Sequence, residues 1–289
     1  MTPENARRTW RSFETVHGMI YFTPDAAEHY AAAGVGHHRT AYFASRSAPM
    51  GAVPSEVTIA TFYNFSPALV RKAMDGVWQH TTPEAVLAAR LTAADSSLTR
   101  AFGADVLASA ELKEAAEQLR RAALVAAERP EGRPLFAGHA SLPWPDEPHL
   151  VLWHAQTLLR EFRGDGHIAA LTTEGLTGIE ALISHGASGD VPAPVLQKSR
   201  AWPEDAWNAA VAGMAERGLV DESGTFTDDG RAQRARIEET TDRLAVAPWA
   251  ALGEDTCARL RATGKKLSRL VIDAGLMGAM AQPPLDDDD

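Results

Sequence analysis

Apolar residues recur every three or four positions along most of this chain, and the strict alternation typical of strands is almost absent. This period predicts amphipathic helices over residues 5–16, 25–33, 39–46, 66–79, 83–102, 108–127, 149–162, 168–185, 192–199, 203–217, 228–246 and 254–274. The exception is the segment 218–227, in which two short apolar runs flank Glu222-Ser-Gly224. That pattern predicts a β-hairpin, after which Thr227 is suited to cap the next helix.

A proline-rich segment interrupts the helical pattern near the middle of the chain. Prolines at 130, 134, 143, 145 and 148 exclude a continuous helix there. A weak repeat relates the flanking parts, since Gly51-Ala-Val-Pro54 is echoed by Gly189-Asp-Val-Pro192. We therefore predict a first half over 1–129, a connector over 130–148, a second half over 149–281 and a disordered acidic tail over 282–289.

The second half carries an ordered series of features that resembles a known DNA-binding fold. A helix ending in Met214–Val220 is followed by a short hairpin, by Phe226–Arg231 and by a long helix, and Leu252–Asp255 opens the last helix. This order resembles the winged helix-turn-helix of MarR-type regulators, which are dimers. The resemblance implies a mainly α fold in which two winged-helix-related halves form a pseudo-dimer within one monomeric chain, with the hairpin as the wing.

A second resemblance concerns the chain as a whole. Pro143–His149 and Arg163–His167 are similar to segments of an actinobacterial family described only as helix-turn-helix proteins. That resemblance implies a fold and brings no activity with it.

Composition and charge limit the cellular compartments and the binding partners to be expected. The chain has 289 residues, one cysteine and a formal net charge of −10. Its apolar runs are shorter than the ~18–20 residues that cross a bilayer, and the N-terminus lacks the pattern of a secretory signal. We therefore expect a cytoplasmic protein that does not engage a membrane. The lone Cys257 excludes an internal disulfide and a thiolate-rich zinc site.

The charges of the predicted recognition helix and wing argue against DNA as a partner. Between Lys198 and Arg231 the basic residues are outnumbered by acidic ones. Because phosphate neutralisation supplies most non-specific affinity, this face is expected to repel DNA. DNA binding is therefore expected to be lost or reduced. A ligand-responsive MarR-like transcriptional regulator stays open as an alternative.

Polar side chains gather around a predicted turn in the second half. In Arg163-Gly-Asp-Gly-His167 the two glycines suit a tight turn, which places His167 at the start of the next predicted helix. Asp165 is then suited either to cap that helix or to orient a histidine. His154 and Glu161 share one face of the preceding predicted helix. A carboxylate–imidazole pair of this kind is suited to general acid–base work near neutral pH.

These residues suggest a second alternative function, a cofactor-independent enzyme of specialised metabolism. The candidate catalytic residues are His17, His154, Asp165 and His167. A structural role, in which Asp165 caps a helix and His154 packs in the core, competes with it. A metal site is disfavoured because the segment 149–167 holds no His-x-x-x-His or Glu-x-x-His pair. We expect neither a metal nor a cofactor.

The first half is unusually rich in aromatic side chains. All four tyrosines and five of the nine phenylalanines lie within residues 1–65. An aromatic-walled cavity with a few polar groups is the usual form of a small-molecule site, although large side chains also fill the core of an alanine-rich protein. The candidate ligand-binding residues are Tyr21, Tyr42, Arg46, Tyr63, Asn64, Glu161 and Arg163. The leading prediction is a small-molecule-binding protein on a winged-helix-derived scaffold.

Overall fold

The structure is a computed structural model that describes residues 1–278. Backbone contacts divide the chain into two compact units that are interleaved along the sequence. Unit 1 comprises Met1–Val53, Gly76–Gly164 and the chain from Asp242 onward, and unit 2 comprises Pro54–Asp75 and Asp165–Thr241. Each unit therefore takes segments from both predicted halves. The predicted boundaries remain predictions, and the tail over 282–289 lies outside the described residues.

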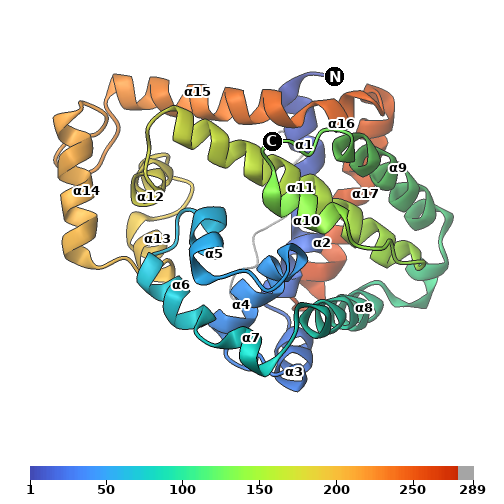
Figure 1. Ribbon diagram of the computed structural model, residues 1–289. Coiled ribbons are helices and arrows are strands. Elements are labelled where there is room, and N and C mark those ends of the chain that lie inside the picture. Colours follow the sequence, from blue (N-terminus) through green and yellow to red (C-terminus); the bar gives the residue numbers. More distant parts are fainter. Residues whose placement is uncertain (279–289) are drawn as a thin grey trace. The chain divides into compact units, whose positions relative to one another are not determined.

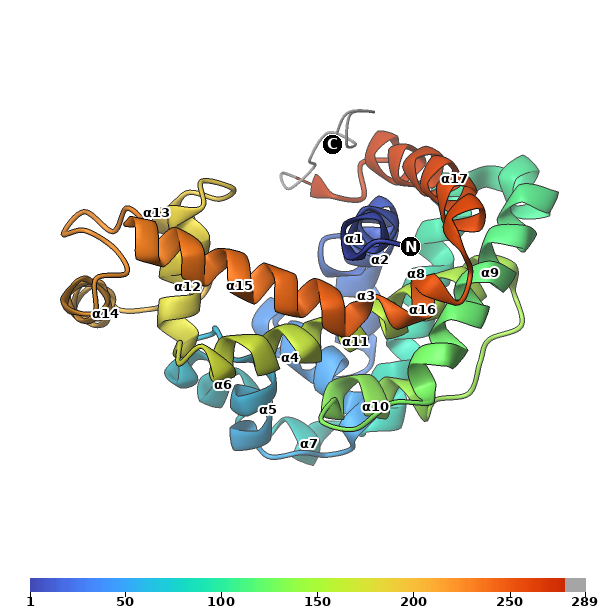
Figure 2. The ribbon, with the colours of Figure 1, turned by 90° about the horizontal axis from the view of Figure 1, so that it is seen from above.

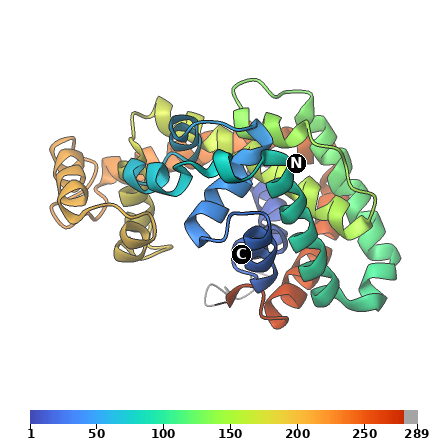
Figure 3. The same ribbon diagram turned by 60° about the horizontal axis from the view of Figure 1, so that its bottom comes forward.

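Unit 1 is built from helices of very different lengths (Figure 1). They are α1 (Pro3–Ser12), α2 (Glu14–Gly18), η1 (Met19–Tyr21), α3 (Pro24–Ala32), α4 (His38–Ser47), η2 (Ala48–Met50), α7 (Val77–His80), α8 (Pro83–Ala108), α9 (Ala110–Ala127), α10 (Pro134–Ala140), the part of α11 (Pro148–Thr173) up to Gly164, α16 (Ala247–Ala250) and α17 (Glu254–Asp273). Helix α1 packs along α17 (Figure 2), and α8 lies beside α17 (Figure 3) and against α3.

The core of unit 1 combines small and large side chains. Ala93, Ala94 and Ala122 are fully buried, and so are the large side chains of Phe13 and Phe136. This pairing follows from close packing, because small side chains on long helices leave space that aromatic rings must occupy.

Unit 2 has its own core. Its helices are α5 (Ser55–Phe62), α6 (Pro67–Met74), the last part of α11, α12 (Gly178–Ala187), α13 (Ala193–Ser199), α14 (Glu204–Glu216) and α15 (Asp228–Ala245) up to Thr241. Leu182, Trp207, Met214 and Ile237 form the centre of this core. They come from α12, α14 and α15, whose apolar faces recur at helical spacing.

The predicted β-hairpin wing is wrong. Residues 1–278 contain no strand, and Val220 and Phe226 form only an isolated antiparallel bridge. The Asp221 carboxylate accepts hydrogen bonds from the backbone N–H groups of Ser223 and Thr225, which closes a tight turn immediately after the bridge. The arms are therefore too short to pair further. The mainly α class is confirmed, whereas the winged form of the fold is not.

The predicted turn at residues 163–167 is also wrong, because α11 continues through it. Neither Gly164 nor Gly166 has a positive φ. A glycine inside a helix costs about 1 kcal/mol relative to alanine, which is less than the ~1.5–3 kcal/mol gained by burying one large apolar side chain. Phe162 and Leu171 are both buried on this helix. Asp165 and His167 are therefore interior positions of α11, not a cap and a helix start.

Two further segments differ from the pattern-based prediction. The helix predicted over 66–79 is divided into α6 and α7, because Gly76 adopts a left-handed conformation with φ 62°. The proline-rich connector contains the short helix α10, which begins at Pro134, a favoured residue for the first helical position. Thr227 does cap α15, since its Oγ1 atom accepts from the backbone N–H of Gly230 at 3.1 Å.

Candidate functional site

A hydrogen-bonded chain of polar side chains lies in the core of unit 1. His17 lies on α2, Tyr21 ends η1, and Trp153 and Thr157 lie on α11. His17 Nε2 is 3.0 Å from the Tyr21 hydroxyl oxygen, and His17 Nδ1 is 3.0 Å from Thr157 Oγ1. The His17 ring also stacks on Trp153, with 5.9 Å between the ring centroids. These contacts determine both the position and the orientation of the imidazole.

The Thr157 hydroxyl determines which nitrogen of His17 carries the proton. Thr157 donates its only hydroxyl hydrogen to the carbonyl oxygen of Trp153, at 2.9 Å. Thr157 Oγ1 must then accept from the Nδ1–H of His17. In a neutral ring Nε2 carries a lone pair, which accepts the hydroxyl hydrogen of Tyr21.

Burial is the main reason that His17 stays neutral. Desolvation holds the pKa of His17 well below its usual value, and the positive charges of Arg160, Arg90 and Arg46 lower it further. An imidazolium here would be buried among guanidinium groups. His17 therefore acts as a neutral hydrogen-bond acceptor toward Tyr21 rather than as a base that takes up a proton.

A chain of ion pairs lies next to this group. Arg46 on α4 donates to both carboxylate oxygens of Glu161, at 2.9 and 3.1 Å, and to the Tyr42 hydroxyl at 2.8 Å. Arg160 donates to Glu161 at 3.0 Å and to Glu14 at 2.8 Å. The two predicted residues Arg46 and Glu161 thus form a charge-assisted pair through Arg46 Nη2, across 115 positions of sequence.

The charge of Glu161 is secured by its neighbours. Burial alone would raise the pKa of Glu161, but the positive charges of Arg46 and Arg160 outweigh it and bring that pKa to about 2. Glu161 and Glu14 together therefore balance the charges of Arg46 and Arg160.

Arg90 lies in the same cluster without an acidic partner. It is 3% exposed on α8, and its guanidinium carbon lies 5.0 Å from the Trp153 ring centroid and 5.9 Å from that of Tyr21. Its terminal nitrogens Nη1 and Nη2 find no hydrogen-bond acceptor, and no carboxylate of residues 1–278 forms an ion pair with it. Tyr30 interacts with Arg90, but burial raises the pKa of that phenol, so it stays neutral. Arg90 is a buried charge that no described group neutralises.

Further polar atoms near Arg90 are also left without hydrogen bonds. They are Nε1 of Trp153 and Nε2 of His139 and of His154. Burial lowers the pKa of His139 well below its usual value, and burial together with the Arg90 charge lowers the pKa of His154 to about 4. Both rings are neutral at physiological pH. The surroundings of Arg90 therefore hold one net positive charge and several unused polar groups.

The structure distributes the predicted site residues over both units. His17, Tyr21, Tyr42, Arg46, His154 and Glu161 belong to the unit 1 cluster described above. Arg163, also in unit 1, takes part in a different ion pair, because its guanidinium lies 2.7 Å from Asp242 and 5.1 Å from the Trp10 ring centroid.

The remaining predicted residues lie in unit 2. The Tyr63 hydroxyl donates to the carbonyl oxygen of Leu176, and the carbonyl oxygen of Asn64 accepts from Trp202 Nε1 at 2.9 Å. His167 Nδ1 is 2.9 Å from Thr241 Oγ1, and Asp165 is buried on α11. The catalytic role of Asp165 and His167 and the ligand-binding role of Tyr63 and Asn64 stay predictions.

Sequence reasoning missed Arg90, although the pattern contains a signal for it. On α8 the buried positions include Val86, Ala93 and Ser97, and Arg90 has the same helical spacing. An arginine at a position that the helical period assigns to the core is rare, because a buried charge normally requires a partner. Trp153, Thr157 and Arg160 were missed for another reason, since their roles depend on which residues α2 and α4 bring next to them.

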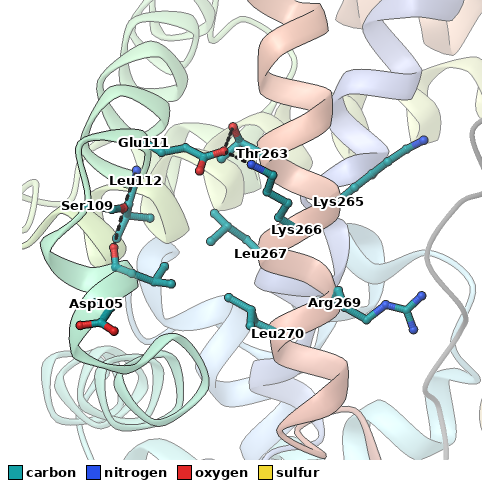
Figure 4. Close-up of a pocket in the computed structure, with 11 residues that line it drawn as sticks. Asp105, Ser109, Glu111, Leu112, Thr263, Lys265, Lys266, Leu267, Arg269 and Leu270 are labelled. Atoms are coloured by element: carbon teal, nitrogen blue, oxygen red, sulfur yellow. Dashed lines mark hydrogen bonds and ion pairs between the residues drawn. The ribbon is translucent and has the colours of Figure 1, made fainter.

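An open cavity of about 650 Å³ lies elsewhere in unit 1, between the α8–α9 connection and α17. Leu267 and Leu270 point into it from α17, and Lys266 reaches across to Glu111 (Figure 4). Its lining carries charges of both signs and shows no buried unpaired group. Within residues 1–278 no cluster of three or more His, Cys, Asp or Glu side chains is arranged to hold a metal ion.

No helix of residues 1–278 combines the length and the apolar character that crossing a membrane requires. Residues 6–278 match the sequence model of a family described as "Helix-turn-helix family". No curated protein and no solved structure matches the chain. The match confirms the helix-turn-helix character predicted from the sequence, and the narrower MarR-type and actinobacterial assignments remain predictions.

Proposed function

The chain belongs to the helix-turn-helix family, and we propose that on this scaffold it binds a small organic anion in unit 1, with Arg90 as the charged anchor and with DNA binding lost or reduced. The observation that carries the proposal is the buried guanidinium of Arg90, which has no ion-pair partner among residues 1–278 and whose Nη1 and Nη2 atoms find no hydrogen-bond acceptor there. A buried unpaired charge costs several kcal/mol, so its presence calls for a compensating group. An anionic ligand supplies that compensation.

The neighbours of Arg90 favour a flat organic anion over an inorganic one. The indole of Trp153 lies against the guanidinium, and the Tyr21 and Tyr42 rings lie 5.3 Å apart in the same cluster. A planar guanidinium matches a carboxylate through two parallel hydrogen bonds, and aromatic walls favour an apolar or aromatic body. Tyr21 is half-buried, which connects the cluster with the surface.

Acid–base catalysis by the predicted histidines receives less support than binding. The pKa values of His17 and His154 are lowered by burial, so both rings are poor bases near neutral pH. The Nε2 lone pair of His17 is also occupied by the Tyr21 hydroxyl. Asp165 and His167 belong to unit 2, where His167 Nδ1 contacts Thr241 Oγ1.

The family description favours one second candidate, a DNA-binding regulator. The charges of unit 2 argue against it, because α14 contains no lysine or arginine. Several arginines of this unit are engaged in ion pairs with Glu56, Glu174, Glu180, Asp228 and Glu238. Fluorescence anisotropy with the DNA upstream of the protein's own gene tests this candidate. Sequence-selective binding in the nanomolar range at physiological salt would establish the regulator and contradict the loss of DNA binding.

Ligand-induced thermal stabilisation tests the proposed anion site. Sodium benzoate and sodium phosphate, each titrated against sodium chloride at equal ionic strength, are added to the intact chain and to Arg90→Met. A ligand that binds only the folded state raises the melting temperature with concentration. We expect benzoate to raise the Tm of the wild-type chain and to leave the Tm of Arg90→Met unchanged.

Arg121→Met is the matched control, because Arg121 is an exposed arginine whose side chain donates a hydrogen bond to Gln118. This variant should respond to benzoate as the wild type does. An equal response of Arg90→Met and the wild type, or no response of either to benzoate or phosphate, would rule out Arg90 as the anchor. Native mass spectrometry of freshly purified protein adds a direct readout, since a co-purified anion should be present in the wild type and absent from Arg90→Met.

A further inference from the structure

The orientation of the Tyr21 hydroxyl indicates which anions the proposed site would select. This inference rests on the proposed function. Tyr21 directs its hydroxyl toward His17 Nε2 at 3.0 Å. The tautomer of His17 is set from the other side of the ring, where Nδ1–H donates to Thr157 Oγ1. Thr157 in turn donates to the carbonyl oxygen of Trp153, which can only accept.

This chain of three hydrogen bonds has one consistent direction. A phenol has a single hydroxyl hydrogen, and Tyr21 donates it to His17 Nε2. No other hydrogen bond to the Tyr21 oxygen exists among residues 1–278. The lone pairs of this oxygen therefore remain available, and a ligand meets an acceptor at this position rather than a donor.

The Tyr21 side chain is also within reach of a ligand anchored on Arg90. The guanidinium carbon of Arg90 lies 5.9 Å from the Tyr21 ring centroid and 5.0 Å from that of Trp153. The guanidinium carbons of Arg46 and Arg160 each lie 5.7 Å from the same ring centroid. The Tyr21 ring thus lies near three positive charges, and its own side chain is half-buried.

We propose that Tyr21 is a specificity-determining residue that selects organic anions carrying a hydroxyl or amino donor, such as a hydroxylated aromatic carboxylate, over anions of the same size that lack one. His17 and Thr157 are positioning residues, which act by holding the Tyr21 hydroxyl hydrogen away from the ligand. A donor group placed against the Tyr21 oxygen forms a hydrogen bond there, whereas an ether oxygen of similar size meets lone pairs and is left without a partner.

Matched probes test this selection on the intact chain. Isothermal titration calorimetry compares benzoate with 3- and 4-hydroxybenzoate and with the corresponding methoxybenzoates, which keep the oxygen and lose the donor. For the isomer whose oxygen reaches Tyr21, the wild type should bind the hydroxyl compound about tenfold more tightly than its methyl ether. Tyr21→Phe should bind benzoate as the wild type does and should lose this preference.

Thr157→Val gives a readout that a merely structural role would not change. Without the Thr157 acceptor, His17 is free to carry its proton on Nε2 and to donate to the Tyr21 oxygen. The Tyr21 hydroxyl hydrogen then turns toward the ligand, so the preference for the hydroxyl compound should disappear or reverse. In the wild type, ¹⁵N NMR of labelled histidine should show a neutral His17 ring, protonated at Nδ1 and bare at Nε2.

The outcomes separate this inference from the anion site itself. Equal affinity of the wild type for hydroxyl and methoxy compounds, with binding still dependent on Arg90, overturns the role of Tyr21 and leaves the proposed function intact. A protonated Nε2 of His17, or a preference that persists in Tyr21→Phe, overturns it as well. Absence of Arg90-dependent binding of every probe, inorganic phosphate included, overturns both proposals together.

Discussion

Arg46 and Glu161 form a buried ion pair in unit 1, in which Arg46 Nη2 lies 2.9 and 3.1 Å from the two carboxylate oxygens. Both side chains are less than 10% exposed. A pair of this kind is stable only because each charge has further partners, which are the Tyr42 hydroxyl for Arg46 and the Arg160 guanidinium for Glu161. The pair anchors α4 to α11 and secures the polar cluster around Tyr21.

Removing one charge of this pair should destabilise the protein. Glu161→Gln keeps the shape of the side chain but leaves Arg46 and part of Arg160 uncompensated in the core, so the free energy of unfolding should fall by about 3–5 kcal/mol. Urea unfolding at neutral pH measures the change. Glu56→Gln, which removes a fully exposed partner of Arg71, should leave the free energy of unfolding unchanged. Similar values for the two variants would contradict the structural importance of the buried pair.

The same carboxylate should make stability depend on acid pH. The folded-state pKa of Glu161 is about 2, below the value of 4.5 for an unperturbed glutamate. Its contribution is therefore fully present above about pH 4.5 and is lost as the pH falls toward 2. Glu161→Gln should remove this part of the pH dependence, which unfolding curves between pH 5 and pH 2 should show.

The buried histidines should weaken the protein at mildly acidic pH. The folded-state pKa values of His17, His139 and His154 lie below the ordinary 6.5. Below pH 6.5 the unfolded chain therefore binds more protons at these histidines than the folded chain does. Their contribution is present above pH 6.5 and is lost as the pH falls below it, by about 1.4 kcal/mol per pH unit for each histidine. His154→Phe should reduce this slope by about 1.4 kcal/mol per pH unit between pH 6.5 and about 4, which corresponds to one proton fewer taken up on unfolding. An unchanged slope would mean that His154 is protonated in the folded protein.

In the absence of ligand, Arg90→Met should stabilise the protein. Replacing an uncompensated buried charge by an apolar side chain of similar length removes a desolvation cost, so we expect the free energy of unfolding to rise by about 1–4 kcal/mol. Arg100→Met on the same helix should have the opposite sign, because Arg100 forms two hydrogen bonds to Asp25, at 2.9 and 2.6 Å. A loss of stability in Arg90→Met, measured by chemical unfolding, would show that Arg90 has a structural partner.

Two helical glycines of unit 2 should respond in opposite ways to alanine. A Cβ atom at Gly178 would collide with the backbone carbonyl of Tyr63, whereas one at Gly213 would meet nothing within 4 Å. Gly178→Ala should destabilise unit 2 by more than 2 kcal/mol, as overpacking does at about 1–3 kcal/mol. Gly213→Ala should stabilise α14 by about 0.5–1 kcal/mol. Thermal unfolding of both variants checks the two signs.

Much of the helical pattern could be predicted because it depends on local periodicity and caps. Helix α14 begins and ends within one residue of the predicted 203–217, and Thr227 caps α15 as expected. The errors fall where local signals conflict with packing. Gly164 and Gly166 suggested a turn, but burial of neighbouring apolar residues keeps α11 continuous. Helix α5 was missed because its β-branched residues lower helix propensity.

The cluster in unit 1 could be predicted only in part. Aromatic enrichment and polar periodicity pointed to Tyr21, Arg46 and Glu161, and these residues lie together. Arg90 carried only a weak signal, namely a charge at core spacing on α8.

The sequence by itself determined the helical class, the acidic character of α14 and the residue types available for a site, because these follow from local periodicity and from charge. Only the tertiary structure decided that Arg46 meets Glu161 across 115 residues and that Arg90 is left without a counter-charge. Partner choice among buried charges depends on which helix faces are packed together. That packing is set by the summed burial of many side chains, so no single stretch of sequence contains it.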